Sequence, residues 1–189
     1  MTDSRLTTFL DTFHPDPKTR GTQWEHVCKW FLETDPVYRT QLKKIWLWSK
    51  WPGRWGPDAG IDLVAEAKDG TLWAIQAKAY APDNAVTKHD VDSFLSESAR
   101  AEFRHRLLIA TTSRVSHAAS RASKAAEKPV SMLLRHGLDR RDGLAGSVYW
   151  PQRTEPEPIL RVVQVAPAPR STSPDPIASN APSMPSVPI

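Results

Sequence analysis

Apolar residues in the first part of the chain follow a helical period and then a strand period. Between residues 21 and 33 they recur at i, i+3, i+4, i+7 and i+8, which predicts a helix with one buried face. The step Asp35-Pro36 ends this helix, because a residue before proline is disfavoured in the α region. Residues 41–51 are rich in aromatic and branched side chains and predict a strand. Residues 51–60 contain five glycine or proline residues and predict a loop.

Two short runs with strand character follow, at residues 61–67 and 71–78, and Lys68-Asp69-Gly70 joins them. A three-residue hairpin loop needs a left-handed residue at its end, and glycine adopts that conformation without strain. Gly70 therefore favours a hairpin with a three-residue loop.

The loop length decides which residues of this hairpin face each other. A two-residue turn would place Asp62 opposite Ala77, whereas the three-residue loop places Asp62 opposite Gln76. In the second register one face is uniformly apolar, with Ile61, Leu63, Ala65, Trp73, Ile75 and Ala77. The other face holds a mixed set, with Asp62, Val64, Glu66, Leu72, Ala74, Gln76 and Lys78. A slip of one residue would mix the two sets, so the pattern favours the three-residue loop.

The rest of the chain up to residue 135 alternates helix and strand. Thr87 with Asp90 three residues later is typical of a helix N-terminus and predicts a helix over residues 88–102. A strand, a helix and a strand are predicted after it, over residues 106–112, 116–128 and 130–135. The order α-β-β-β-α-β-α-β predicts an α/β fold in which helices flank a central mixed β-sheet.

Composition separates this body from the C-terminal end of the chain. Of the 17 prolines in 189 residues, ten lie between Pro151 and Pro188. We expect a domain over residues 1–150 and a Pro-rich, disordered tail over residues 151–189. The single cysteine, Cys28, excludes an intrachain disulfide and a CxxC zinc site. No apolar run approaches the ~18–20 residues of a membrane span, so we expect a soluble, cytoplasmic protein without a membrane partner.

Positive charge is concentrated in one stretch. The net charge is +4, yet residues 100–141 hold ten Lys or Arg and three Asp or Glu, a local excess of 10 − 3 = +7. Such a stretch is typical of a polyanion partner, most often nucleic acid. A solvated helix face that aids solubility would give the same count, so charge alone leaves both interpretations open.

The favoured hairpin register brings a carboxylate, an amide and an ammonium to one end of the sheet. Asp62 can bind a hard divalent cation such as Mg²⁺, and Gln76 offers a neutral amide oxygen. Lys78, two residues on, projects to the same face and can position an attacking water. Glu25, on the first helix, is a candidate for a further metal contact or for orienting a water. Each residue alone has an ordinary structural explanation, and only their combined spacing favours a site.

Two sequence strings carry a resemblance to a known family. The first string resembles the PD-(D/E)xK nucleases, and more narrowly their Mrr-like branch, in which glutamine replaces the second acid. It consists of Gly21-x-x-Trp24-Glu25, followed later by Asp62 and, after thirteen residues, by Gln76-x-Lys78. A longer string resembles the N-terminal nuclease domain of type ISP restriction-modification enzymes and their helicase relatives. It consists of Trp46-Leu47-Trp48, Trp51-Pro52-Gly53-Arg54, Gly60-Ile61-Asp62-Leu63 and Gln76-x-Lys78-x-Tyr80. The similarity covers residues 6–138.

The resemblance implies a restriction-endonuclease-like three-layer sandwich with a central mixed sheet. It also implies a Mg²⁺-dependent endonuclease, with Mn²⁺ as a substitute, that hydrolyses phosphodiester bonds of foreign double-stranded DNA in a restriction or phage-defence system. By position, Asp62 would be the principal metal ligand, Gln76 the second, Lys78 the catalytic lysine and Glu25 the helix acid. Asp58 is a weaker candidate that precedes the hairpin.

The chain departs from the large members of this family in two ways. It has no phosphate-binding GxxxxGK[ST] motif, and a Pro-rich end stands where a helicase motor would follow. The expected partners are therefore double-stranded DNA, a separate helicase or methyltransferase subunit, and a second copy in a homodimer. Candidate DNA contacts are Arg54, Trp55, Lys88 and Arg114. Trp46 and Trp48 are expected in the core, whereas Trp51 and Trp55 are open between core packing and base stacking.

Two alternatives to an active nuclease stay open on the sequence. One is a DNA-binding subunit with a vestigial site, because Gln76 supplies one negative charge fewer than an acid. The other is a docking module in a defence assembly, which would use the basic stretch to bind a partner protein. Metal binding that depends on Asp62 separates the nuclease from both, and salt-sensitive duplex binding separates the two alternatives.

Overall fold

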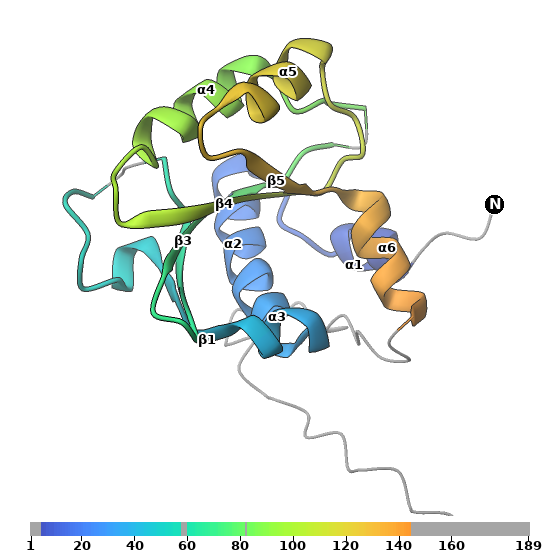
Figure 1. Ribbon diagram of the computed structural model, residues 1–189. Coiled ribbons are helices and arrows are strands. Elements are labelled where there is room, and N and C mark those ends of the chain that lie inside the picture. Colours follow the sequence, from blue (N-terminus) through green and yellow to red (C-terminus); the bar gives the residue numbers. More distant parts are fainter. Residues whose placement is uncertain (1–4, 58–59, 82, 145–189) are drawn as a thin grey trace, which may run out of the picture.

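A five-stranded mixed sheet forms the middle layer of the computed structural model (Figure 1). The strands are β1 (Leu42–Leu47), β2 (Leu63–Ala67), β3 (Leu72–Lys78), β4 (Phe103–Ala110) and β5 (Val130–Leu133). They lie in the order β1-β2-β3-β4-β5, with the first three antiparallel and with β3, β4 and β5 parallel. The predicted α/β fold with a central mixed sheet is confirmed.

Helices cover both faces of this sheet (Figure 1). They are α1 (Arg5–Leu10), α2 (Pro17–Thr34), α3 (Pro36–Gln41), α4 (Lys88–Glu97), α5 (His117–Ala125) and α6 (Arg135–Leu144), with a short 3₁₀ helix, η1 (Trp48–Lys50). On one face lies α2, and on the other lie α4 and α5, so the arrangement has three layers. Beyond the edge strand β5, α1 contacts α6.

The structure describes residues 5–57, 60–81 and 83–144. The expected domain boundary at residue 150, the Pro-rich stretch 151–189 and Asp58 lie outside these residues. Among the described residues, no helix combines the length and the apolar character needed to cross a membrane.

The helix α2 has the buried face that its periodicity predicts, but it begins four residues earlier than expected. Its buried side chains are Trp24, Val27, Cys28, Phe31 and Leu32. The early start is due to Asp16, whose carboxylate accepts the Thr19 N–H at 2.8 Å, and to Pro17 in the first turn. At the other end Asp35 ends α2 as expected and also caps α3, since its carboxylate accepts the Val37 N–H at 2.9 Å.

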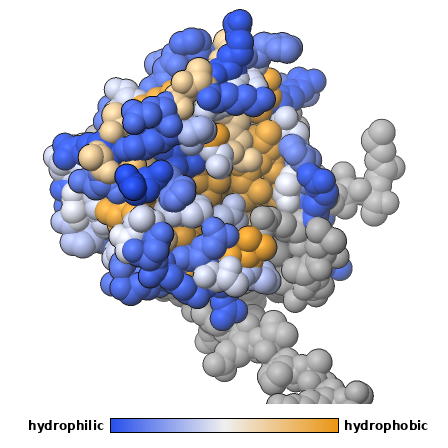
Figure 2. Space-filling model, viewed as in Figure 1, coloured by the Kyte–Doolittle hydropathy of each residue, from blue (hydrophilic) through white to orange (hydrophobic). Residues whose placement is uncertain are grey.

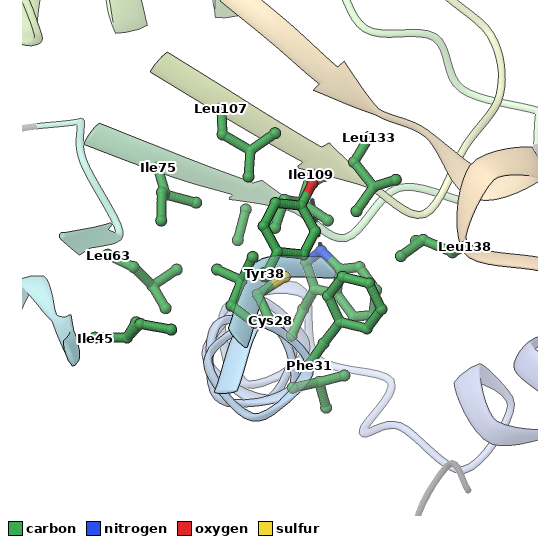
Figure 3. Close-up of a cluster of buried hydrophobic side chains, with 14 of the residues drawn as sticks. Cys28, Phe31, Tyr38, Ile45, Leu63, Ile75, Leu107, Ile109, Leu133 and Leu138 are labelled. Carbon is green, nitrogen blue, oxygen red and sulfur yellow. Dashed lines mark hydrogen bonds between the residues drawn. The ribbon is translucent and has the colours of Figure 1, made fainter. Parts of the chain in front are cut away.

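Two clusters of buried side chains fill the two spaces between the layers. The first joins α2 to the sheet and includes Cys28, Phe31, Ile75 and Ile109 (Figure 3). The second lies under α4 and α5, where Val64 and Ala74 of the hairpin are fully buried with Val91 and Phe94 of α4 and with Trp48 and Trp51. The middle of the mixed face is thus buried as well, and its polar residues lie toward the two ends, with Glu66 near the loop and Gln76 and Lys78 at the other end. Ile61 belongs to this second cluster rather than to the apolar face, because it precedes β2.

The tryptophans before the hairpin divide between the core and its margin. Trp48 and Trp51 are buried, so Trp51 is a core residue, whereas Trp46 and Trp55 are half-buried. Lys44 covers the ring of Trp46, with its Nζ 5.0 Å from the ring centroid.

The buried Arg106 explains why α4 ends at Glu97 and not at residue 102. Its Nε donates to the Ser98 hydroxyl at 2.7 Å and its Nη2 to the Ser98 carbonyl at 2.9 Å, which fixes the chain just after the helix. Its Nη1 donates to the Lys128 carbonyl at 2.6 Å. Arg106 therefore joins β4 to two loops, and it does not contribute to a basic surface as the charge count suggested.

Other differences from the predicted elements are at boundaries and in short helices. The strand expected over residues 41–51 ends at Leu47, and the one expected over 130–135 ends at Leu133. The helix expected over 116–128 spans His117–Ala125, with Ser116 as its cap. Three helices, α1, α3 and α6, were not predicted.

The space-filling view in Figure 2 shows a largely hydrophilic outer surface over α4 and α5. Hydrophobic residues are visible in the middle of this face, where β5 lies at the edge of the sheet. Met132 and Leu134, in and next to β5, are only partly buried against the second cluster.

The β2–β3 hairpin has the predicted register. The Ala67 N–H donates to the Thr71 carbonyl at 2.8 Å, and Leu63 lies opposite Ile75. Gly70 has a φ of 84°, which is the left-handed conformation that the three-residue loop requires. This register places Asp62 next to Gln76, one pair beyond the end of β2.

We predict that Gly70→Ala lowers the free energy of unfolding by about 1 kcal/mol, because a Cβ is strained at positive φ. Nothing lies within 4 Å of the added Cβ, so the cost is conformational. Gly21→Ala should instead raise the free energy of unfolding by about 0.5–1 kcal/mol, because Gly21 lies within α2 and nothing lies within 4 Å of the added Cβ. Urea denaturation measures both, and a Gly70→Ala protein as stable as wild type would contradict the turn assignment.

Candidate active site

The candidate site lies where β3 ends and where the chain enters β2. Asp62 is held there through its backbone, since its N–H donates to the Ile75 carbonyl at 3.0 Å and its carbonyl accepts the Trp48 N–H at 2.8 Å. Its side chain is also held, because Oδ2 accepts the Ala77 N–H at 2.7 Å. The carboxylate is therefore anchored to the backbone of β3 at the end of the sheet.

Gln76 is buried beside this carboxylate, with 4% of its surface exposed. Its Nε2 donates to the Gly60 carbonyl at 3.1 Å, and its Oε1 is buried without a hydrogen-bond partner. A buried acceptor left unpaired costs about 1–3 kcal/mol. An oxygen held in this way is suited to a cation, which would satisfy it.

Gly60, which accepts the Gln76 hydrogen bond, is positioned by α4. It has a φ of 60°, and a Cβ on it would lie 3.0 Å from Cγ of Glu97. The close approach of the loop to α4 therefore needs glycine at this position. The Gly60 carbonyl in turn fixes the orientation of the Gln76 amide.

Lys78 follows two residues later and faces the α4 layer, as Gln76 does. Its carbonyl accepts the Thr111 N–H at 3.1 Å, which ties the end of β3 to β4. Its Nζ lies 3.5 Å from Oδ1 of Asp90, and the two side chains are 29% and 13% exposed. The ammonium is thus held on the α4 side of the site.

Asp90 is a residue of this site that the sequence analysis assigned only to the start of a helix. Burial would raise the pKa of its carboxyl, but hydrogen bonds from Thr87 and Tyr80 and the charge of Lys78 outweigh burial, so its pKa is lowered. Burial and the hydrogen bond to Asp90 raise the pKa of the Tyr80 phenol. No spacing in the sequence indicates the contact with Lys78, because it depends on the loop that folds α4 back onto β3.

Glu25 lies half-buried on α2, in the layer opposite α4. The neighbouring Trp24 donates its Nε1–H to the Ile109 carbonyl at 3.4 Å, which fixes this part of α2 beside the end of β4. Burial, and then the charges of Asp62 and Glu25, raise the pKa of the Cys28 thiol. Both carboxylates therefore act on the same thiol, which lies in the core between α2 and the sheet.

The residues present suit a hard cation. Within the described part of the chain, no three His, Cys, Asp or Glu side chains are grouped as a metal site. The oxygen donors available are the Asp62 carboxylate and the unpaired Gln76 Oε1, and oxygen is the donor that Mg²⁺ prefers. A bound cation would also reduce the repulsion between the Asp62 carboxylate and a phosphate.

The four candidate DNA contacts lie in different settings. Arg54 is exposed in the loop before β2. Trp55 packs against Trp48 with ring centroids 4.6 Å apart, and the Arg100 guanidinium covers it at 3.7 Å. Lys88 pairs with Asp92, and Arg114 donates to the Asp83 carbonyl at 2.9 Å. Each of these four DNA contacts stays a prediction.

Comparison with known proteins gives a family and two similar solved structures. A family model described as restriction endonuclease matches residues 33–142, which include Asp62, Gln76 and Lys78 but not Glu25. The ATP-dependent type ISP restriction-modification enzyme LlaBIII, bound to DNA, is 32% identical with a TM-score of 0.54 over 60% of this chain. The DNA modification-dependent restriction endonuclease AspBHI is 15% identical with a TM-score of 0.52 over 78% of this chain.

These matches differ in what they establish. The similarity to AspBHI concerns the fold alone, and it covers 39% of that chain. This chain spans 7% of the length of LlaBIII. No curated protein is significantly similar to it.

We predict that Gln76→Glu lowers the free energy of unfolding of the metal-free protein by about 2 kcal/mol at neutral pH, because a buried carboxylate replaces the donor to the Gly60 carbonyl. Burial raises the pKa of such a carboxyl, so the deficit should shrink as the pH falls and the group becomes protonated. Adding Mg²⁺ should restore stability to this variant and not to Gln76→Met. Thermal unfolding at several pH values, with and without Mg²⁺, measures the pH dependence and the effect of the cation. A loss of stability in Gln76→Glu that Mg²⁺ leaves unchanged would contradict a cation beside residue 76.

Proposed function

The chain belongs to the restriction endonuclease family, and from this premise we propose that it hydrolyses phosphodiester bonds of double-stranded DNA with Mg²⁺ held by Asp62 and Gln76. A nuclease is what the family establishes, and divalent ions are its general cofactor. The metal, the site residues and the substrate are the proposed part.

The observation that carries this proposal is the buried, unpaired Oε1 of Gln76. Its amide is oriented by the Gly60 carbonyl, and it lies beside a carboxylate anchored at 2.7 Å to the Ala77 N–H. An unpaired buried acceptor costs free energy, so stability alone does not favour it. A catalytic role or a bound ion is a known explanation for such a group.

Each residue has a distinct role in the proposed reaction. Asp62 and Gln76 would hold the cation with a carboxylate and an amide oxygen, and Glu25 would orient a water or add a further contact. When bound, the cation would neutralise the phosphate and stabilise the charge that develops on its oxygens. Lys78 would place its ammonium beside the same phosphate and the attacking water. In the hydrolysis one P–O bond forms to water, one ester P–O bond breaks, and the leaving oxygen takes a proton.

The biological setting extends the proposal. We propose that the substrate is foreign DNA in a restriction or phage-defence system. The similarity to LlaBIII, a restriction-modification enzyme solved bound to DNA, supports this. A separate helicase or methyltransferase subunit, or a second copy of the chain, would supply specificity. The nuclease would occupy residues 1–150, with residues 151–189 outside the catalytic unit.

We predict that Asp62→Ala abolishes Mg²⁺-dependent cleavage of plasmid DNA, because the principal metal ligand is lost. Lys78→Ala should also abolish cleavage while leaving the affinity for Mg²⁺ near the wild-type value, because an ammonium is no metal ligand. Glu66→Gln is the matched control, since Glu66 is a carboxylate of the same hairpin that pairs with Lys43 away from the site. Agarose-gel nicking assays and titration calorimetry measure the two properties.

Cleavage by Asp62→Ala at the wild-type rate would refute the site. Absence of cleavage in the folded wild type, with salt-sensitive DNA binding retained, would instead favour a DNA-binding subunit with a vestigial site.

We predict that Arg54→Ala and Lys88→Ala each weaken duplex binding. Both side chains are exposed and basic, Arg54 in the loop before β2 and Lys88 at the start of α4. Each lost phosphate contact should reduce the slope of log K against log salt by about 1. Lys68→Ala is the control, because Lys68 lies at the hairpin loop, at the other end of β3 from Lys78. Fluorescence anisotropy between low and physiological salt measures the slopes, and equal slopes in all three variants would exclude Arg54 and Lys88 as contacts.

A further inference from the structure

Asp90 lies where α4 begins beside the end of β3, and its two carboxylate oxygens have different partners. Oδ2 accepts the Thr87 N–H at 2.8 Å and the Thr87 hydroxyl at 2.6 Å, which closes a capping box. Oδ1 lies 3.5 Å from Nζ of Lys78. A capping box uses one oxygen of its acidic residue, so the second oxygen serves the ammonium and not the helix.

Asp90 is also held from the β3 side. The Tyr80 phenol lies near this carboxylate, and burial followed by the proximity of Asp90 raises the pKa of Tyr80. The carboxylate therefore contacts Thr87 of the helix cap and Lys78 of β3. Its side chain is 13% exposed, so these contacts are only partly screened by solvent.

The loop that carries Asp90 back to β3 is braced by the end of β4. The hydroxyl of Thr111 donates to the Tyr80 carbonyl and that of Thr112 to the Asn84 carbonyl, each at 2.7 Å. Arg114 donates to the Asp83 carbonyl at 2.9 Å. A bridge between Val86 and Val115 adds a further tie. The separation between the start of α4 and the end of β3 is thus fixed by three side chains of one segment.

We propose that Asp90 is a positioning residue for the reaction, which holds the Lys78 ammonium in the place where the scissile phosphate binds. This inference rests on the proposed function. A lysine side chain has four rotatable bonds and loses rotamer entropy when it is fixed. Asp90 holds it before the substrate arrives, so the reaction does not have to order it.

Two substitutions separate this role from helix capping. Asp90→Asn keeps an oxygen that can accept the Thr87 N–H but removes the charge that faces Lys78. Thr87→Ala removes the hydroxyl of the cap and leaves the charge of Asp90 in place. We expect Asp90→Asn to lower kcat about 10- to 100-fold, the cost of a small misplacement of a catalytic group, with KM close to the wild-type value.

The other variants complete the comparison. Thr87→Ala should lower the melting temperature through loss of the cap and lower kcat far less than Asp90→Asn does, because the charge that faces Lys78 remains. Asp90→Glu should recover part of the activity, because it restores the charge and glutamate is common at this capping position. Should Asp90→Asn fail to fold, Tyr80→Phe removes only the phenol hydroxyl near Asp90. It should lower kcat below the wild-type value, and an unchanged kcat would count against the positioning role.

A readout independent of cleavage is the motion of the Lys78 side chain. In protein labelled with ¹³C at lysine Cε, relaxation should show Lys78 more ordered than other surface lysines in wild type and in Thr87→Ala, and mobile in Asp90→Asn.

Equal kcat in Asp90→Asn and wild type, with Asp62→Ala inactive, would overturn the positioning role and keep the proposed function. Equal loss in Asp90→Asn and Thr87→Ala would reduce Asp90 to a helix cap. Cleavage that is the same in Asp62→Ala and wild type would mean that the proposed function itself has failed, and the positioning role with it.

Discussion

The hydrogen bond from the Ala77 N–H to the Asp62 carboxylate is the contact on which the site depends. It fixes a carboxylate from the entry to β2 against the backbone of β3, beside Gln76. A shift of one residue in the hairpin would move Asp62 opposite Ala77 and turn the following side chains to the other face. The three-residue loop that ends at Gly70, with its φ of 84°, prevents that shift. The geometry of a turn at one end of the hairpin thus sets the chemistry at the other end.

The layers around the hairpin explain why polar groups are concentrated at its end. Val64 and Ala74 lie fully buried under α4, while Ile75 and Ala77 are buried toward α2, so the middle of the hairpin is apolar on both faces. Polar side chains remain only where the strands leave the sandwich. There the fold accepts an unpaired Gln76 oxygen, which stability alone would not favour. A cation would satisfy this oxygen, which is why the local instability and the proposed chemistry point to the same position.

The parts of this arrangement that local rules determine could be predicted from the sequence. The buried face of α2, the hairpin register and the Thr87–Asp90 cap each depend on residues a few positions apart, and the structure has all three. The ends of elements were harder, because Arg106 ends α4 through contacts with Ser98 that bridge separate segments. The helices α1, α3 and α6 are short or lack a clear apolar period, so periodicity did not indicate them. The contact of Lys78 with Asp90 depends on a loop braced by β4, and no spacing in the sequence encodes it.

The central claim is that the Oε1 of Gln76 and the carboxylate of Asp62 hold one divalent cation. The most direct measurement is a Mg²⁺ titration of ¹⁵N-labelled protein, followed through the side-chain amide of Gln76 and the backbone amide of Ala77, which donates to Asp62. We expect both signals to shift together with a single binding constant, and neither to shift in Asp62→Ala. Signals that stay in place at saturating Mg²⁺, while amides elsewhere in the chain move, would contradict the claim.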